Sequence, residues 1–178
     1  PCKNDLPNDQ TCLSILHIPF SNDHYELTDY ELRQSKTDKN PSYTINTLKF
    51  LTKKSPSAFF LIMCSDALAT ITLWYQWEMI LNYCHILVVS RKEDDLKVNG
   101  LGPKVFDFVT KHKIDKLEDL SIKDKGGIYF AKFPLLPFSS TDIRTKMSQK
   151  KSIENLVTPE VSDFIKKTAS YTSDGHKI

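Results

Sequence analysis

The chain has 178 residues, a hydrophobic content of 40% and a charged content of 26%, which is ordinary for one globular domain. A formal net charge of +2 is too small to favour nucleic-acid or membrane binding, and we expect neither. The four cysteines form no Cys-x-x-Cys pair, the five histidines show no metal-ligand spacing, and no signal peptide or transmembrane run is present. These features predict a reduced, cytoplasmic protein without a metal held by its own side chains.

The first half of the chain contains two predicted helices before its most apolar segment. Apolar spacing predicts a helix at 10–18, and the alternation around Tyr25 is compatible with a short strand at 23–29. Residues 34–40 are expected to form a polar loop. A helix at 44–54 then places Ile45 and Leu48 on one face.

The apolar run at 58–64 is too short to cross a membrane and is typical of a strand buried on both faces. It ends at Ser65 and Asp66, and a second strand is predicted at 85–89, just before Arg91. The two tryptophans, Trp74 and Trp77, lie between them. This is the pattern of a β-α-β unit, and open α/β sheets bind ligands beyond the carboxyl ends of their strands.

Four further elements are predicted in the second half. A surface loop at 93–102 leads to a helix at 103–113 that begins with Pro103. A strand follows at 127–132, then a helix at 139–147 and a last helix from Thr158. The alternation of strands and helices predicts a single α/β domain over residues 1–178.

Three motifs in this order resemble bacterial nicotinate-nucleotide adenylyltransferases, which join nicotinate mononucleotide to ATP in NAD synthesis. Pro41–Leu48 is similar to the family's Pro-Ser-Tyr-Thr-x-x-Thr-Leu. The strand with Asp66-Ala67-Leu68, Trp74 and Arg91 is similar to the family's core. Ser139–Arg144 is similar to Ser-x-Thr-x-Ile-Arg. Each motif alone is weak, but three in the right order make the resemblance specific.

The resemblance implies a Rossmann-like nucleotidyltransferase fold, with a parallel sheet and helices on both faces. It implies ATP and nicotinate mononucleotide as substrates, Mg²⁺ on the ATP phosphates, and a monomer or homodimer. The phosphate of the mononucleotide would attack the α-phosphorus of ATP, and pyrophosphate would leave. No nucleophile from the protein is needed, so catalysis would consist of positioning and charge stabilisation.

By the same resemblance, Thr44 and Trp74 contact the nicotinate end, Asp66 binds a ribose hydroxyl, and Arg91 contacts a phosphate or base. Each residue also has a purely structural interpretation. Thr44 could cap a helix, Asp66 could be an N-cap, Trp74 could pack in the core, and Arg91 could be a solvated charge. Trp77 is expected to be a packing residue.

The start of the helix at 139–147 also has two interpretations. The resemblance assigns Ser139, Thr141 and Arg144 to the ATP phosphates, at a helix N-terminus that favours anions. Alternatively, Ser139 and Asp142 form a capping box.

The sequence departs from the family's pattern in two places. The His-x-Gly-His signature of the first strand and loop is not present, so we expect the catalytic residues in a β-α segment before Pro1, and a break between Pro7 and Gln10. Cys64 stands where the family has glycine, and its side chain either narrows the approach of a nucleotide or points into the core.

Two other functions remain open from the sequence. One is a non-catalytic nucleotide-binding protein. The other is an adenylyltransferase for a different phosphate, either nicotinamide mononucleotide or phosphopantetheine, and Pro41–Leu48 argues more strongly against the second of these.

Overall fold

The computed structural model describes residues 9–22, 24–37, 41–90, 101–132 and 139–168. The chain divides into two compact units. Gln34–Leu136 forms the larger unit, and Pro1–Arg33 with Pro137–Ile178 forms the smaller one. Helix α2 (Tyr30–Thr37) contains the boundary between them. The predicted break between Pro7 and Gln10 begins outside the described residues.

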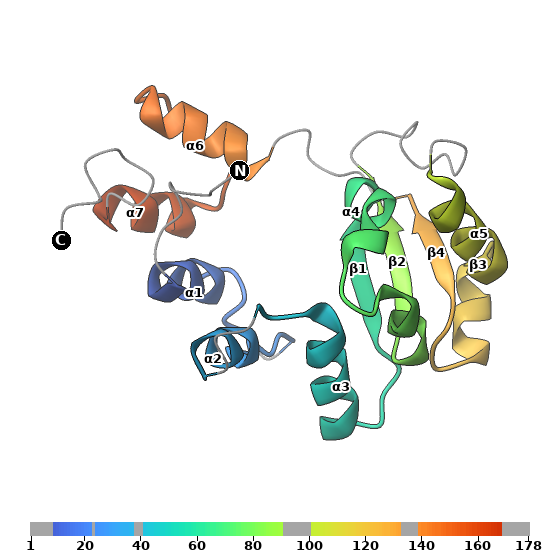
Figure 1. The fold of residues 1–178 in the computed structure, drawn as a ribbon. Coiled ribbons are helices and arrows are strands. Elements are labelled where there is room, and N and C mark those ends of the chain that lie inside the picture. Colours follow the sequence, from blue (N-terminus) through green and yellow to red (C-terminus); the bar gives the residue numbers. More distant parts are fainter. Residues whose placement is uncertain (1–8, 23, 38–40, 91–100, 133–138, 169–178) are drawn as a thin grey trace. The chain divides into compact units, whose positions relative to one another are not determined.

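A four-stranded parallel sheet forms the centre of the larger unit (Figure 1). The strand order is β1-β2-β4-β3, with every neighbouring pair parallel. The strands are β1 (Phe60–Cys64), β2 (His85–Val89), β3 (Lys113–Ile114) and β4 (Ile128–Ala131). Strands β1, β2 and β4 lie where they were predicted, and the parallel sheet confirms the α/β prediction.

Helices α3 (Thr44–Lys54) and α5 (Pro103–His112) begin and end close to the predicted positions. Between and after them lie α4 (Ser65–Ala69) and the 3-10 helices η1 (Ile71–Leu73), η2 (Trp77–Asn82) and η5 (Leu117–Ile122), whose bounds were not predicted. Pro103 opens α5, as expected for a residue without a backbone N–H at the first helical position. Trp77 packs edge-on against Phe108 of α5 at 4.9 Å, which confirms its packing role.

One face of the sheet carries the main core. The buried members of this core are Ile45, Leu48, Met63, Leu68, Ile71, Ile80, Leu81, Cys84, Ile86, Val88, Val105, Val109 and Ile128. The strand residues in this set share one face, because side chains alternate along a strand. Helices α3, α4 and α5 all contribute to it, so these three helices share that face. The chain moves across the sheet in one direction from β1 to β2 and then beyond it toward β4. Right-handed connections that run in the same direction place their helices, here α4 and α5, on the same face of the sheet.

The expectation that β1 is buried on both faces is wrong. Met63 points into the core, but Phe60 and Ile62 on the opposite face are 47% and 64% exposed. The reason is tertiary: β1 ends the strand order, and the three helices named above cover only the other face. The helical layer expected on the second face is not formed by any of these three helices.

His85 and Gly127 connect β2 with the start of β4. The Gly127 backbone N–H donates to Nδ1 of His85 at 2.9 Å, so Nε2 carries the proton and donates to the Lys123 carbonyl at 2.7 Å. A Cβ on Gly127 would lie 2.2 Å from Cδ1 of Ile114 and 2.9 Å from Nδ1 of His85. A larger residue at this position would therefore displace the His85 ring and the Ile114 side chain.

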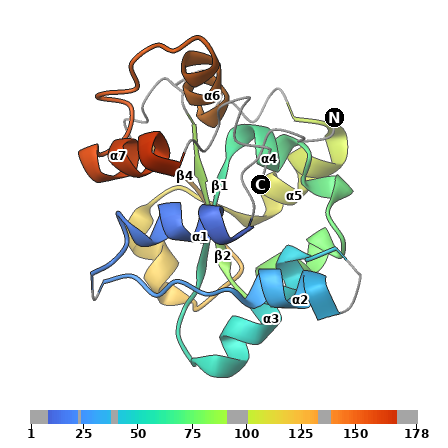
Figure 2. The same ribbon diagram turned by 90° about the vertical axis from the view of Figure 1, so that its left-hand side faces the viewer.

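The smaller unit has its own apolar cluster. It contains α1 (Asp9–His17), α6 (Ser140–Ser148) and α7 (Pro159–Thr168), shown in blue, orange and red in Figures 1 and 2. Ile153, Val161 and Ile165 are buried at its centre, and Ile15 and Ile143 pack against them. All three helices correspond to predicted ones.

Two predictions between these helices are wrong. Residues 24–29 form no strand in the described structure, and Tyr25 instead packs edge-on against Phe20 at 4.8 Å. The expected loop at 34–40 begins inside α2, whose first turn is stabilised by an Asp29–Arg33 ion pair at 2.9 Å. A polar helix of this kind lacks the apolar periodicity by which helices are recognised in a sequence.

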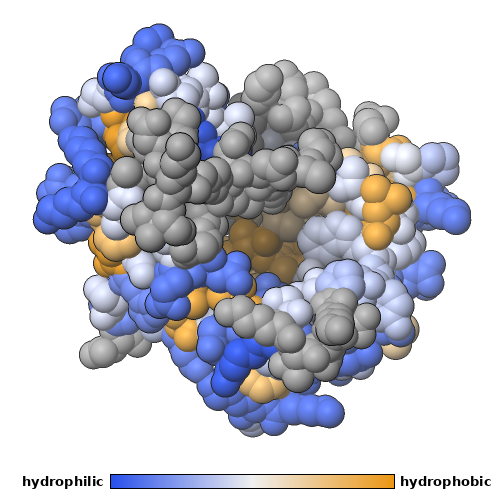
Figure 3. All heavy atoms as spheres, turned by 60° about the vertical axis from the view of Figure 1, so that its left-hand side comes forward, coloured by the Kyte–Doolittle hydropathy of each residue, from blue (hydrophilic) through white to orange (hydrophobic). Residues whose placement is uncertain are grey.

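Among the described helices, none combines the length and the apolar character that crossing a membrane requires. Figure 3 shows hydrophilic side chains over much of one face, with smaller apolar groups between them.

Candidate functional site

The carboxyl end of β1 leads directly into α4, as the sequence predicted. Asp66 lies in the first turn of α4, is exposed, and accepts a 2.9 Å hydrogen bond from the Ala67 N–H. The N-cap of this helix is Cys64, so the interpretation of Asp66 as the N-cap is wrong. Ser65 Oγ donates to Ser90 Oγ at 3.3 Å and thereby connects the ends of β1 and β2. An exposed carboxylate at this edge can accept hydrogen bonds from hydroxyl groups of a ligand.

The N-cap of α3 is Tyr43, and its side chain makes no capping hydrogen bond. Within the first turn, the Asn46 N–H donates to the Tyr43 carbonyl at 2.9 Å. The helix-cap interpretation of Thr44 is therefore wrong, and the hydroxyl of this half-buried residue is not used as a cap. Uncapped N–H groups at a helix N-terminus, together with the helix dipole, favour an anion such as a carboxylate.

Two tyrosines bring the first turn of α3 next to the Trp74 segment. The rings of Tyr43 and Tyr75 are 4.6 Å apart and inclined by 36°. Tyr43 directly precedes Thr44, and Tyr75 directly follows Trp74. Trp74 itself is half-buried and packs partly against the main core. Its structural and functional interpretations are compatible, because part of the indole contacts the core and part remains accessible.

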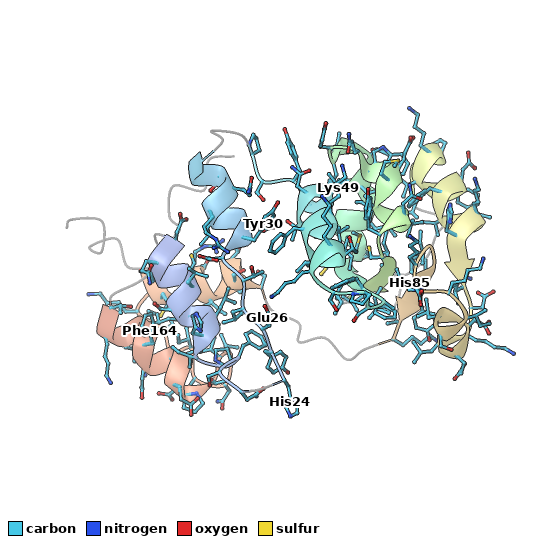
Figure 4. The ribbon with its side chains drawn as sticks, turned by 90° about the horizontal axis from the view of Figure 1, so that it is seen from below. His24, Glu26, Tyr30, Lys49, His85 and Phe164 are labelled. Atoms are coloured by element: carbon cyan, nitrogen blue, oxygen red, sulfur yellow. The ribbon has the colours of Figure 1, made fainter. Side chains whose placement is uncertain are left out.

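A cavity of about 370 Å³ opens beside this aromatic pair. It is lined by Gln34, Pro41, Ser42, Tyr43, Asn46, Lys49, Tyr75 and Gln76. The lining is mainly polar and includes one cation, Lys49, which Figure 4 labels on α3.

The sequence analysis missed the cavity residues that join α3 to the Trp74 segment. Lys49 Nζ donates to Oε1 of Gln76 at 3.2 Å, and Nε2 of Gln76 donates to Oη of Tyr75 at 3.2 Å. Tyr43 could have been found, since it lies inside the Pro41–Leu48 motif. No signal in the sequence pointed to Lys49 or Gln76.

The start of α6, in the smaller unit, holds the third group of predicted site residues. Ser139 and Asp142 form the capping box: Ser139 Oγ accepts from the Asp142 N–H at 3.3 Å, and an Asp142 carboxylate oxygen accepts from the Ser139 N–H at 2.6 Å. The capping interpretation is thus confirmed. Arg144 Nη2 donates to Oγ1 of Thr141 at 2.9 Å, which directs the guanidinium toward the first turn.

In the larger unit, the contact between Tyr43 and Tyr75 joins the chain neighbours of Thr44 and Trp74, whereas Asp66 follows β1 at the carboxyl end of the strand. Ser139, Thr141 and Arg144 share one helix of the smaller unit. Arg91 lies outside the described residues. Within the described ranges, no cluster of three or more His, Cys, Asp or Glu side chains is arranged to bind a metal.

Burial raises the pKa of the Cys84 thiol to about 11, against a smaller lowering by a hydrogen bond with the Leu61 backbone. Cys84 Sγ lies 3.6 Å from the Ile80 carbonyl oxygen in the main core. A neutral, buried thiol of this kind is a packing residue.

Comparison with known proteins gives consistent results. The model of the cytidylyltransferase-like family matches residues 17–146. A Psychromonas ingrahamii protein named probable nicotinate-nucleotide adenylyltransferase is 36% identical over 149 residues, which cover 83% of this chain and 68% of that protein. A Shewanella frigidimarina protein of the same name is 30% identical over 148 residues, again covering 83% of this chain and 68% of the relative.

The fold also matches solved structures. The Plasmodium falciparum nicotinic acid mononucleotide adenylyltransferase complexed with APC superposes with a TM-score of 0.60 at 18% identity, covering 96% of this chain and 79% of that one. The same enzyme complexed with NaAD gives a TM-score of 0.57. At these identities the likeness shows the fold alone.

Proposed function

Because the chain belongs to the cytidylyltransferase-like family and, within it, to the nicotinate-nucleotide adenylyltransferases, we propose that it transfers AMP from ATP to nicotinate mononucleotide. A phosphate oxygen of the mononucleotide forms a bond to the α-phosphorus of ATP. The bond from that phosphorus to the bridging oxygen breaks, and pyrophosphate leaves. The products are nicotinate adenine dinucleotide and pyrophosphate, and no covalent enzyme intermediate is required.

The contact between Tyr43 and Tyr75 is the observation that best supports this proposal. It brings an uncapped helix N-terminus next to a partly accessible tryptophan. The ring of nicotinate mononucleotide is aromatic and carries a carboxylate. An indole face suits the ring, and backbone N–H groups of the first turn suit the carboxylate. Thr44 and Trp74 are therefore assigned to the nicotinate end.

Asp66 is assigned to a ribose hydroxyl. Its side chain is exposed, and its hydrogen bond from the Ala67 N–H occupies one carboxylate oxygen, Oδ1. A carboxylate has acceptor capacity beyond one such bond. Arg91, assigned to a phosphate or base, directly follows Ser90 at the end of the neighbouring strand and remains a prediction from the sequence.

The ATP phosphates are assigned to the start of α6. Arg144 already lies against Thr141 in the first turn, and an arginine at a helix N-terminus suits phosphate oxygens. Mg²⁺ would enter with ATP, held by the phosphate oxygens rather than by a cluster of protein side chains. We also propose that both compact units belong to one nucleotidyltransferase domain, since the family match at 17–146 includes parts of both. The oligomeric state, monomer or homodimer, stays a prediction.

The catalytic contribution of these residues would be positioning and electrostatics. Bringing the two phosphates together in the attacking geometry removes much of the entropic barrier of a two-substrate reaction. Cationic groups at the phosphates stabilise charge that develops in the transition state.

A direct assay tests the proposal. The full-length protein is incubated with MgATP and nicotinate mononucleotide, and formation of the dinucleotide and of pyrophosphate is followed by chromatography and a coupled assay. We expect both products in equal amounts. Binding of ATP without any turnover would instead support the non-catalytic alternative, and faster turnover of nicotinamide mononucleotide would support the amide-specific one.

A further inference from the structure

We propose that Lys49 and Gln76 are positioning residues for mononucleotide binding, holding the first turn of α3 at a fixed distance from the Trp74 segment. This inference rests on the proposed function, because it assumes that these two segments bind the nicotinate end. Neither residue is expected to touch the substrate. Their role is to act through Tyr43 and Tyr75.

The backbone of Gln76 is the first reason for this proposal. Gln76 is the N-cap of η2 and has φ 51° and ψ 37°, in the left-handed region. Residues with a Cβ are unfavourable there, and glycine is the usual choice. The reversal at Gln76 directs the chain from Trp74 and Tyr75 into η2. A glutamine at this position of positive φ can make side-chain hydrogen bonds, which glycine cannot.

The side chain of Gln76 makes hydrogen bonds in two directions. Its Oε1 accepts from Lys49 Nζ at 3.2 Å, which connects it to α3. Its Nε2 donates to Oη of Tyr75 at 3.2 Å, which fixes the ring that packs on Tyr43. The oxygen of the Gln76 amide thus binds α3, and its nitrogen binds the aromatic pair of Tyr43 and Tyr75.

The two connections join the same pair of segments at different points. Tyr43 contacts Tyr75 at the beginning of α3, and Lys49 contacts Gln76 further along the same helix. Two separated contacts resist rotation of one segment about the other, whereas a single contact acts as a pivot. The pair Lys49 and Gln76 therefore adds a second constraint to the core packing that already holds α3 beside the Trp74 segment.

The expected change in KM follows from the solvent exposure of the hydrogen bond between Lys49 and Gln76. Gln76 is exposed and Lys49 half-buried, so their hydrogen bond is modest in strength. We expect its loss to raise KM for nicotinate mononucleotide about three- to tenfold. We expect KM for ATP to remain within about twofold, and kcat to change less than KM for the mononucleotide.

The test uses variants of the full-length protein whose structural effects differ. Gln76→Gly removes both side-chain hydrogen bonds but relieves the backbone at positive φ, so it should keep the melting temperature close to that of the parent. Lys49→Met removes the donor while keeping the aliphatic stem. Lys49→Arg keeps a cationic donor and should retain most of the parental KM. Lys53→Met, one turn further along α3 and exposed, is the matched control for loss of a lysine.

The double variant provides the strictest measurement. If the two residues act as one contact, Lys49→Met combined with Gln76→Gly should raise KM no more than Gln76→Gly alone, because that change already removes the bond to Lys49. Fully additive effects, or KM changes that follow the loss of melting temperature, would overturn the inference. Parental KM in both single variants, with an active parent, would overturn it while leaving the proposed function intact. A parent that forms no dinucleotide at all would overturn both.

Discussion

The ring of Tyr43 lies 4.6 Å from the ring of Tyr75, at an angle of 36°. Each tyrosine is the chain neighbour of a residue assigned to the nicotinate end, Thr44 in one case and Trp74 in the other. The pair therefore connects two segments that are well separated in the sequence. It gives the substrate assignments a physical basis that the motifs alone do not provide.

Substrate preference is the first prediction. The uncapped first turn of α3 should favour the carboxylate of nicotinate over the neutral amide of nicotinamide. One preorganised, charge-assisted contact is worth roughly 1.5–3 kcal/mol, about ten- to a hundredfold. The ratio of kcat/KM for the two mononucleotides measures this directly. Equal values would contradict a carboxylate site at this helix.

The second prediction concerns the two tryptophans. Trp74→Ala should weaken mononucleotide binding by about 1–3 kcal/mol, on the scale of aromatic–base stacking, with little change in ATP binding. Trp77→Ala is the matched control, because Trp77 packs on Phe108 and should lower the melting temperature without a specific loss of affinity. Isothermal titration and thermal melts separate the two effects. If Trp74→Ala lowers only stability, Trp74 is a core residue.

Gly127 is the subject of the third prediction. In Gly127→Ala the new methyl would lie 2.2 Å from Cδ1 of Ile114 and 2.9 Å from Nδ1 of His85, so these two side chains must shift. We expect a loss of about 1–3 kcal/mol in the free energy of unfolding, as for other overpacked sites. Gly102→Ala is the comparison for steric crowding, since nothing lies within 4 Å of its new methyl, although alanine is less favourable than glycine at this N-cap of α5. Urea denaturation of both variants should show the larger loss at Gly127.

The fourth prediction separates capping from phosphate binding on α6. Asp142→Ala breaks the capping box and should reduce stability by about 0.5–2 kcal/mol. Arg144→Ala should leave stability nearly unchanged but raise KM for ATP or lower kcat, because its observed bond is only to the exposed Thr141. Lys146→Ala on the same helix controls for loss of a cation. An Arg144→Ala enzyme with parental kinetics would remove Arg144 from the site.

Cysteine reactivity is the fifth prediction. With its pKa raised to about 11 by burial, Cys84 stays protonated at pH 8, and the thiolate is the reactive form. Cys84 should therefore be alkylated more slowly than the half-buried Cys64 in the native protein. Because the folded state holds this proton more tightly than the unfolded one, the corresponding stability is present below pH 9 and is lost as the pH rises through 11. Mass spectrometry after timed alkylation measures the first effect.

Several elements and residues could be predicted because their signals are local. The helix of Thr44–Lys54 follows from its apolar face, α5 from Pro103, and the strands β1, β2 and β4 from short apolar runs. The capping box at Ser139 was also visible as a pattern of neighbouring residues. Helix α2 was not predicted, because a short polar helix has no apolar stripe to reveal it.

The sequence by itself determined the α/β class, the order of most elements and the family, since each depends on residues close together in the chain or on motifs of fixed spacing. The tertiary structure decided which segments meet. Lys49 and Gln76 are 27 residues apart, and only the path of the chain through β1, α4 and η1 brings them within hydrogen-bonding distance. The tertiary structure also decided that Ile62 is exposed, because burial depends on which face of the sheet the helices cover. An apolar run in the sequence does not show which face that is.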